Sequence, residues 1–174
     1  HLRSDPRYMP YQIADQKRRH QAPLVIALET LLRLPVLRLR VSEISDLLSV
    51  AAIRERFGIQ ESDLPRLQQW IKHANIRWGL DAPHRESLDL PGMDSIHSWH
   101  YGLQRMLYGY AMGPLDADLA THDNIVPLDE VTGLDAALVG PFAQFIETLS
   151  RQLDVLNTDH TPQDWAEILH TLLI

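Results

Sequence analysis

Two arginines and a tryptophan lie close together in the stretch Ile76–Arg85, which reads IRWGLDAPHR. Guanidinium groups such as those of Arg77 and Arg85 pair with phosphates. An indole such as that of Trp78 stacks on a nucleic-acid base, a contact worth about 1 to 3 kcal/mol. These three side chains are therefore candidates for holding a single DNA strand.

The same stretch also has a structural interpretation, in which it forms a fixed, packed corner. A buried Trp78 would donate its indole N–H to a carbonyl, and Gly79 would supply a position with positive φ. Asp81 would pair with a neighbouring arginine or with Arg105, which lies in an apolar stretch. His84 would hydrogen-bond the turn. This structural interpretation is the favoured one, because buried tryptophans and Arg–Asp pairs are common in helical corners.

A short basic run near the start of the chain is the best local candidate for phosphate contact. It consists of Lys17, Arg18 and Arg19, followed by a histidine. The alternative is that a run this short is only a solvated face. Three more arginines would extend the basic surface: Arg33, Arg38 and Arg40.

Charge is distributed unevenly along the 174 residues, whose net charge is −7. Residues 1–40 carry eight basic and three acidic side chains, residues 41–110 carry seven and nine, and residues 111–174 carry one and eleven. A net negative chain argues against an autonomous nucleic-acid binder. Any phosphate-facing surface must come from the first two thirds, and we expect the acidic last third to meet solvent or a protein partner.

Several kinds of chemistry find no support in the sequence. There is no G-x-x-x-x-G-K-[ST] loop to bind a triphosphate, and no carboxylate cluster with nuclease spacing, so we expect neither cofactor nor catalytic residue here. Cysteine is absent, which excludes disulfides and thiolate metal sites. His97 and His100 would share a helical face, but without a third ligand a metal site is not expected.

Two motifs in the right order resemble the RecC family. Ile76–Arg85 is similar to the family stretch IRWGLDAxHR, and Trp99–Met112 (WHYGLQRMLYGYAM) is similar to WxxGLxRMLxGYAM. Shorter similar pieces occur at Pro10–Asp15, Ser42–Leu48 and Gly133–Gly140. The resemblance therefore covers nearly the whole chain.

The resemblance implies an internal segment of the gamma subunit of the bacterial RecBCD helicase-nuclease, also called exodeoxyribonuclease V. Such a subunit lacks its own motor, while its partners, the alpha and beta subunits, use ATP and Mg²⁺. It would act in the cytoplasm, without a membrane, on DNA ends and single strands during double-strand-break repair by recombination. Implied roles are scaffolding, strand separation and conducting the strand inspected for Chi. The implied place in the architecture is the helical 2B-type insertion of a superfamily 1 helicase-like subunit.

Apolar spacing predicts an all-α, irregular multi-helix fold forming a single domain over 1–174. Residues 1–22 are expected to be an irregular lead-in and residues 113–130 a long acidic loop. Helices are expected to begin at Pro23, at a cap on Ser42 and at a Thr161 cap. The longest helix would start near Leu134 and be kinked or divided near Pro141.

A protein-binding module without DNA contact is the alternative function. Gly102 and Gly109 lie seven residues apart on one predicted helix and would form a groove for the close approach of another helix. Together with the acidic last third, this groove would dock another chain. Loss of DNA affinity with rising salt would distinguish phosphate contact from an apolar interface.

Overall fold

The computed structural model describes residues 23–112, 125–131 and 133–173. These ranges contain α-helices and short 3-10 helices and no β-strand, so the all-α prediction is confirmed. The predicted lead-in 1–22 and most of the predicted loop 113–130 lie outside the described residues. The elements are α2 (Pro23–Leu32), η2 (Leu34–Val36), α3 (Val41–Ser49), α4 (Ala51–Arg56), η3 (Glu61–Asp63), α5 (Leu64–His73), α6 (Ala82–Ser87), α7 (Trp99–Met112), η5 (Gly133–Leu138), α8 (Val139–Leu156) and α9 (Pro162–Leu173).

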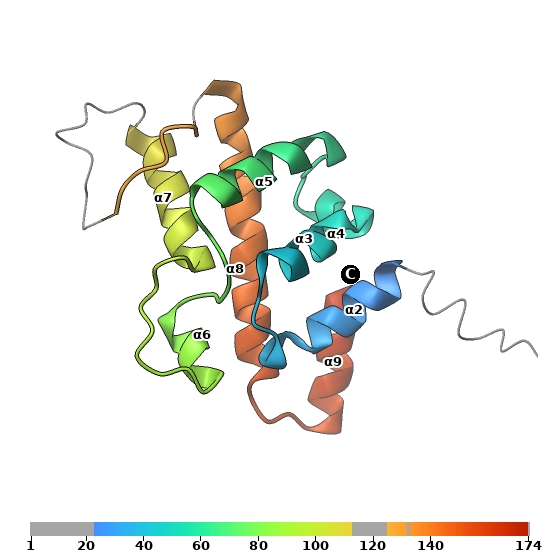
Figure 1. Cartoon of the computed structure of the whole chain (residues 1–174). Helices are drawn as coiled ribbons and strands as arrows, with labels where there is room; N and C mark the ends of the chain where they lie inside the picture. Colours follow the sequence, from blue (N-terminus) through green and yellow to red (C-terminus); the bar gives the residue numbers. More distant parts are fainter. Residues whose placement is uncertain (1–22, 113–124, 132, 174) are drawn as a thin grey trace, which may run out of the picture.

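Helix α8 is the longest described helix and the centre of the arrangement (Figure 1). Helix α7 packs beside it, and η2 and η5 also contact it. Its apolar residues recur at three and four positions, which places them on one buried face. The buried residues are Val139, Phe142, Phe145, Ile146, Leu149, Leu153 and Leu156.

Local sequence signals fix several helix ends. Pro23 opens α2, as predicted, and Gly58 follows α4 with a φ of +69°, which a helix end of this kind favours. At α9, the Thr161 N–H donates to Asp164 Oδ2 at 2.9 Å and the Asp164 N–H donates to Thr161 Oγ1 at 3.3 Å. This reciprocal pair is a capping box, which satisfies N–H groups that a helix start otherwise leaves free.

Two predicted helix starts are wrong in detail. Ser42 lies inside the first turn of α3, and Arg40 is the cap residue, with its N–H donating to Glu43 Oε2 at 2.8 Å. The stretch after Gly133 is a 3-10 helix, and the α-helix begins only at Val139. The expected division near Pro141 therefore falls at Leu138, and Pro141 occupies the first turn of α8, where its missing N–H has no intrahelical partner to lose.

Not every apolar residue at helical spacing faces the core. On α2, Leu24 is 60% exposed and Ala27 is the buried residue. On α7, Leu107 and Tyr110 are 41% and 58% exposed, while Trp99, Leu103 and Met106 are buried. Helical spacing identifies an apolar face, but the neighbouring elements determine how much of that face is buried.

The glycines of α7 pack inside the chain and not against a second helix. A Cβ on Gly102 would overlap the Ile76 side chain, and a Cβ on Gly109 would overlap the backbone of Leu128. Both close approaches are therefore already occupied within the chain. The prediction of a Gly102/Gly109 groove for docking another chain is wrong.

Candidate functional site

Residues 76–85, here called the central corner, are tied by backbone hydrogen bonds to the segment that precedes α3. The Gly79 N–H donates to the Arg38 carbonyl at 2.8 Å, and the Val41 N–H donates to the Arg77 carbonyl at 3.2 Å. These bonds join parts of the chain nearly 40 residues apart. They bring Arg38 and Arg77 close together on the molecule.

A second set of hydrogen bonds ties the corner to the start of α7. The Arg77 N–H donates to the His97 carbonyl at 2.9 Å, and the Trp99 N–H donates to the Gly79 carbonyl at 3.0 Å. The Trp99 indole is fully buried and donates its Nε1–H to the Leu39 carbonyl at 2.7 Å. The indole–carbonyl bond predicted for Trp78 is thus made by Trp99, and the corner is enclosed on both sides.

Arg85 lies inside the corner and is only 2% exposed. Its Nη1 donates to the Asp94 carbonyl at 2.5 Å and to the Ile96 carbonyl at 3.0 Å, and its Nη2 donates to the Trp78 carbonyl at 2.9 Å. Burial lowers the pKa of Arg85, while Asp94 and Asp81 oppose that change. The guanidinium binds carbonyl oxygens of the turn and presents no surface to a DNA phosphate.

Gly79 and Trp78 frame this buried arginine. Gly79 has a φ of +78°, as predicted, and a Cβ there would lie 2.8 Å from Arg85 Nε. Trp78 is half-buried, with the Cζ atoms of Arg85 and Arg38 lying 4.6 Å and 6.0 Å from its ring centroid. The indole is therefore engaged by cations, an arrangement worth about 0.5 to 2 kcal/mol.

Asp81 and His84 close the corner on the other side. The His84 N–H donates to Asp81 Oδ1 at 2.8 Å, so Asp81 caps α6, and Asp81 Oδ2 lies 3.4 Å from Nδ1 of His100. His84 is buried and its Nδ1 accepts the Leu80 N–H at 3.2 Å, as its predicted turn role requires. Burial lowers the pKa of His84; Asp81 acts in the opposite direction and Arg85 in the same one.

Arg105 does not pair with Asp81, so that prediction is wrong. Its Nε donates to the Val126 carbonyl at 2.8 Å, and its Nη1 donates to the carbonyls of His73 and Ala74 at 3.3 and 3.0 Å. The carbonyls at the end of α5 have no intrahelical donor, and a guanidinium satisfies them. Arg105 therefore ties the segment 125–131 to α5.

Three exposed arginines line one open hollow beside the corner. Arg38, Arg40 and Arg77 surround it together with Val41, Ser42 and Trp78. We call this feature the arginine hollow. Of the sequence-predicted DNA candidates, Arg77 and Trp78 belong to it, whereas Lys17, Arg18 and Arg19 lie outside the described residues. The basic surface expected at Arg38 and Arg40 joins the corner, a juxtaposition that sequence alone did not reveal.

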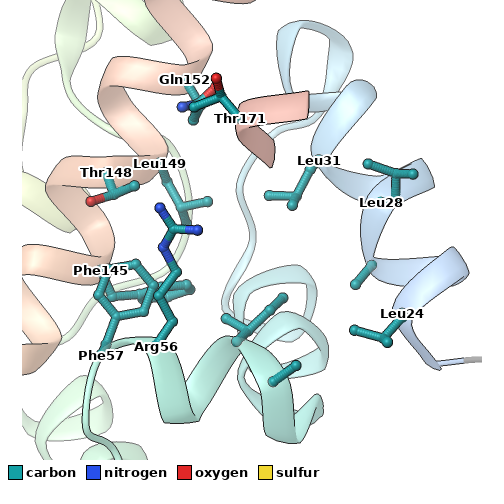
Figure 2. Close-up of a pocket in the computed structure, with 13 residues that line it drawn as sticks. Leu24, Leu28, Leu31, Arg56, Phe57, Phe145, Thr148, Leu149, Gln152 and Thr171 are labelled. Carbon is teal, nitrogen blue, oxygen red and sulfur yellow. The ribbon is translucent and has the colours of Figure 1, made fainter. Parts of the chain in front are cut away.

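A second pocket is apolar and lies between α2, α4, α8 and α9. Figure 2 shows Leu24, Leu28 and Leu31 of α2 on one side, and Phe57 and Phe145 on the other. Leu24, Val25 and Ile26 beside it are exposed. An exposed apolar surface of this kind suits contact with protein and not with phosphate.

The described residues contain no group of three or more histidine or acidic side chains arranged to hold a metal ion. His97 precedes α7 with a φ of +65° and contacts the Asn75 carbonyl, whereas His100 lies near Asp81 and Glu147. The two histidines thus serve different contacts. In the same part of the chain, no helix combines the length and the apolar character that crossing a bilayer requires.

The fold and the site define a helical domain with a rigid, arginine-filled corner and neither a metal cluster nor a triphosphate-binding loop in what is described. The chain belongs to the family described as the fourth domain of the RecBCD enzyme subunit RecC, whose model matches residues 21–174. The resemblance inferred from the sequence motifs is confirmed.

Individual relatives agree with this assignment. The chain is 35% identical over 167 residues to the RecBCD enzyme subunit RecC of Escherichia coli strain K12, covering 96% of this chain. It is 35% identical to the RecC subunit of Mycolicibacterium smegmatis and 32% identical to that of Haemophilus influenzae, over 91% and 95% of this chain. The chain spans 14% of the length of each of these relatives.

Proposed function

We propose that the chain is the fourth domain of a RecC-type gamma subunit and works within a bacterial RecBCD helicase-nuclease. The match of residues 21–174 to the family model is the observation that carries this proposal. The complex, an exodeoxyribonuclease V, would degrade linear DNA and repair double-strand breaks by homologous recombination in the bacterial cytoplasm. The alpha and beta subunits would be its partners and would use the ATP and Mg²⁺.

Within that complex, we propose a non-catalytic scaffold and DNA-channel role. The enclosed corner around Arg85 gives the domain a rigid element, and the arginine hollow offers cations at its surface. These features suit a 2B-type domain that helps conduct the strand inspected for Chi. The basic run at Lys17, Arg18 and Arg19 remains a candidate for the same strand path.

A protein-binding role without DNA contact is the second candidate. The observation that favours it is the exposed apolar surface of α2, at Leu24, Val25 and Ile26, beside the apolar pocket. Under this hypothesis the domain braces other parts of the longer subunit or its partners. Under this hypothesis the docking surface would lie on α2 and not at the α7 glycines that the sequence suggested.

A domain replacement in the Escherichia coli subunit tests the proposal. The matching segment of that subunit is exchanged for this chain, and the purified complex is assayed for ATP-dependent degradation of linear duplex DNA. We expect degradation within about tenfold of the unmodified complex, because the two segments are 35% identical over nearly all of this chain. Recombination frequency in cells lacking their own RecC is the second measurement.

The corresponding segment of the Haemophilus influenzae subunit serves as the matched control, since that subunit has a similar identity to this chain. An assembled replacement complex that neither degrades DNA nor restores recombination, while the control replacement does both, would show that this chain does not act as a RecC fourth domain.

A further inference from the structure

The arginine hollow is built by a strained segment of backbone. Leu39 is 1% exposed and has a φ of +51°, a conformation that a non-glycine residue adopts at a cost of about 1 to 2 kcal/mol. Its carbonyl is held by the buried indole of Trp99. With Leu39 turned into the core, Arg38 and Arg40 on either side of it are exposed. Strain of this kind persists only where the surrounding structure maintains it.

Within the part of the chain that the structure describes, the three guanidiniums of the hollow have no acidic partner. Among the described residues, no hydrogen bond or ion pair engages the side chains of Arg38, Arg40 or Arg77, apart from the position of Arg38 over the Trp78 ring. Glu43, close by on α3, accepts the Arg40 backbone N–H. Three adjacent unpaired cations repel one another, and an anion between them relieves that repulsion.

Some other exposed arginines of this chain have side-chain partners, whereas Arg33 and Arg56, which are also exposed, have none among the described residues. Arg66 pairs with Asp135 at 2.6 Å, and Arg151 donates to Thr148 Oγ1 at 3.1 Å. In a chain with a net charge of −7, carboxylates are available to pair with surface arginines. Within the described residues, the hollow differs from the rest of the surface because it brings three unpaired guanidiniums side by side.

We propose that the arginine hollow binds successive phosphates of a DNA strand, with Arg38, Arg40 and Arg77 as the ligands. This inference rests on the proposed function, which supplies DNA as the polyanion. Guanidinium is suited to the task because its fork of N–H donors matches phosphate oxygens. The contact is made to the backbone of the strand and carries no sequence information.

Trp78 is a support for the hollow and not a stacking platform. Its ring is already engaged by two guanidiniums, with the Cζ atoms of Arg85 and Arg38 at 4.6 Å and 6.0 Å from the centroid. The strand is thus held by its phosphates. An abasic strand of equal length should bind within about twofold of a thymidine strand, whereas loss of a stacked base would reduce affinity by about tenfold.

Binding of a fluorescein-labelled 15-nucleotide oligothymidylate to the 174-residue chain tests the proposal. Anisotropy titrations are compared for the parent chain, for R38A/R40A/R77A and for R56A/R66A/R151A, between 50 and 200 mM NaCl. The second triple removes the same charge from exposed arginines that do not line the hollow. We expect at least about tenfold weaker binding only in the hollow triple, and a log–log salt slope smaller by about 2, since each phosphate contact on a single strand contributes about 0.7.

An equal loss of affinity for the oligonucleotide in both triple variants would overturn the proposal. A parent chain that fails to bind the oligonucleotide at 50 mM NaCl would also overturn it. Circular dichroism and urea midpoints establish that each triple is folded. If the replacement complex still degrades DNA but the isolated chain does not bind the oligonucleotide, the proposed phosphate site is refuted and the proposed function stands. If the isolated chain binds the oligonucleotide through the hollow but the replacement complex does not degrade DNA, the proposed function is refuted and the phosphate site stands.

Discussion

At the scale of single residues, the corner depends on buried polar groups and on the neighbours that they contact. Arg85 fills its interior and binds carbonyls of residues 78, 94 and 96. Burying a guanidinium is costly unless its N–H groups are bound. Both Nη atoms of Arg85 are bound, whereas its buried Nε has no hydrogen-bond partner among the described residues. Gly79 leaves the space in which the arginine lies.

Gly79→Ala should destabilise the chain more than Gly92→Ala. Both glycines have a φ of +78°, but only at Gly79 would a Cβ meet a neighbour, Arg85 Nε at 2.8 Å, whereas nothing lies within 4 Å at Gly92. The common backbone strain is about 1 to 2 kcal/mol, and overpacking should add about 1 to 3 kcal/mol at Gly79. Urea unfolding followed at 222 nm measures the difference. Equal losses would show that Arg85 moves aside without penalty.

His84 should make the stability of the chain depend on pH. Burial holds the pKa of His84 below its ordinary value of 6.5, so the folded state takes up a proton less readily than the unfolded state. The free energy of unfolding should therefore be fully present above about pH 6.5 and fall as the pH decreases below it. Urea titrations at several pH values between 5 and 8 measure this dependence.

The control for that experiment is His170→Gln, which changes an exposed histidine of α9. His84→Gln should flatten the pH dependence between pH 5 and 7, because the unfolded state loses the group that takes up the proton. His170→Gln should leave it unchanged. If the free energy of unfolding of His84→Gln still depends on pH in this range, the dependence arises from other groups.

At the scale of elements, the connection that follows residue 124 is fastened to α5 and α7. Arg105 of α7 binds the Val126 carbonyl, and Glu130 lies within contact of His73 and Gln69 of α5. The Leu128 N–H donates to the Arg105 carbonyl at 2.9 Å. The chain therefore returns to the core before α8 begins.

Gly109→Ala should loosen this fastening although alanine is the better helix former. Alanine favours a helix interior by up to about 1 kcal/mol relative to glycine, but at Gly109 its Cβ would overlap the Leu128 backbone. We expect a net loss of about 1 to 3 kcal/mol. Gly140→Ala in α8, where nothing lies within 4 Å, should be neutral or stabilising in the same thermal or urea unfolding series. Stabilisation in both variants would mean that the Leu128 segment is not packed against α7.

Sequence alone predicts those elements whose signals are local. The start at Pro23 and the capping box at Thr161 each depend on a few adjacent residues. The exposure of Leu24 and Tyr110 could not be predicted, because it depends on which elements cover each helix. The carbonyl partners of Arg105 and Arg85 could not be predicted either, because every residue has a carbonyl and only the fold decides which carbonyls lie near a given arginine. The arginine hollow requires residues 38–40 and 77 to meet, which no local spacing encodes.

At the scale of the whole molecule, charge and apolar surface lie in different places. The three arginines of the hollow lie beside the corner, whereas the exposed apolar residues of α2 lie beside the pocket of Figure 2. Ten units of net negative charge fall within residues 111–174. A domain with two such surfaces can contact DNA and protein at once, as the proposed role requires.

Leu24→Ser combined with Ile26→Ser should weaken assembly of the replacement complex while leaving the isolated chain folded. Both side chains are already exposed, so their loss removes little of the core. We expect recovery of the partner subunits in an affinity pull-down to fall severalfold, because the apolar surface would lose its contact. The control is Val36→Ser combined with Val126→Ser, which changes two apolar residues outside α2 whose exposure is similar to that of Leu24 and Ile26. Undiminished assembly in the α2 variant would exclude α2 as the interface.

The bond between the Trp99 indole and the Leu39 carbonyl also has a consequence for synthesis of the protein. It spans 60 residues, and the corner needs a third segment, at 77–79, between its two ends. A growing chain that has left the ribosome only as far as α6 therefore holds Arg38, Arg40 and Arg77 without the indole that fixes them. The arginine hollow, which is the proposed phosphate site, is completed only when α7 emerges, so an incomplete translation product would lack it.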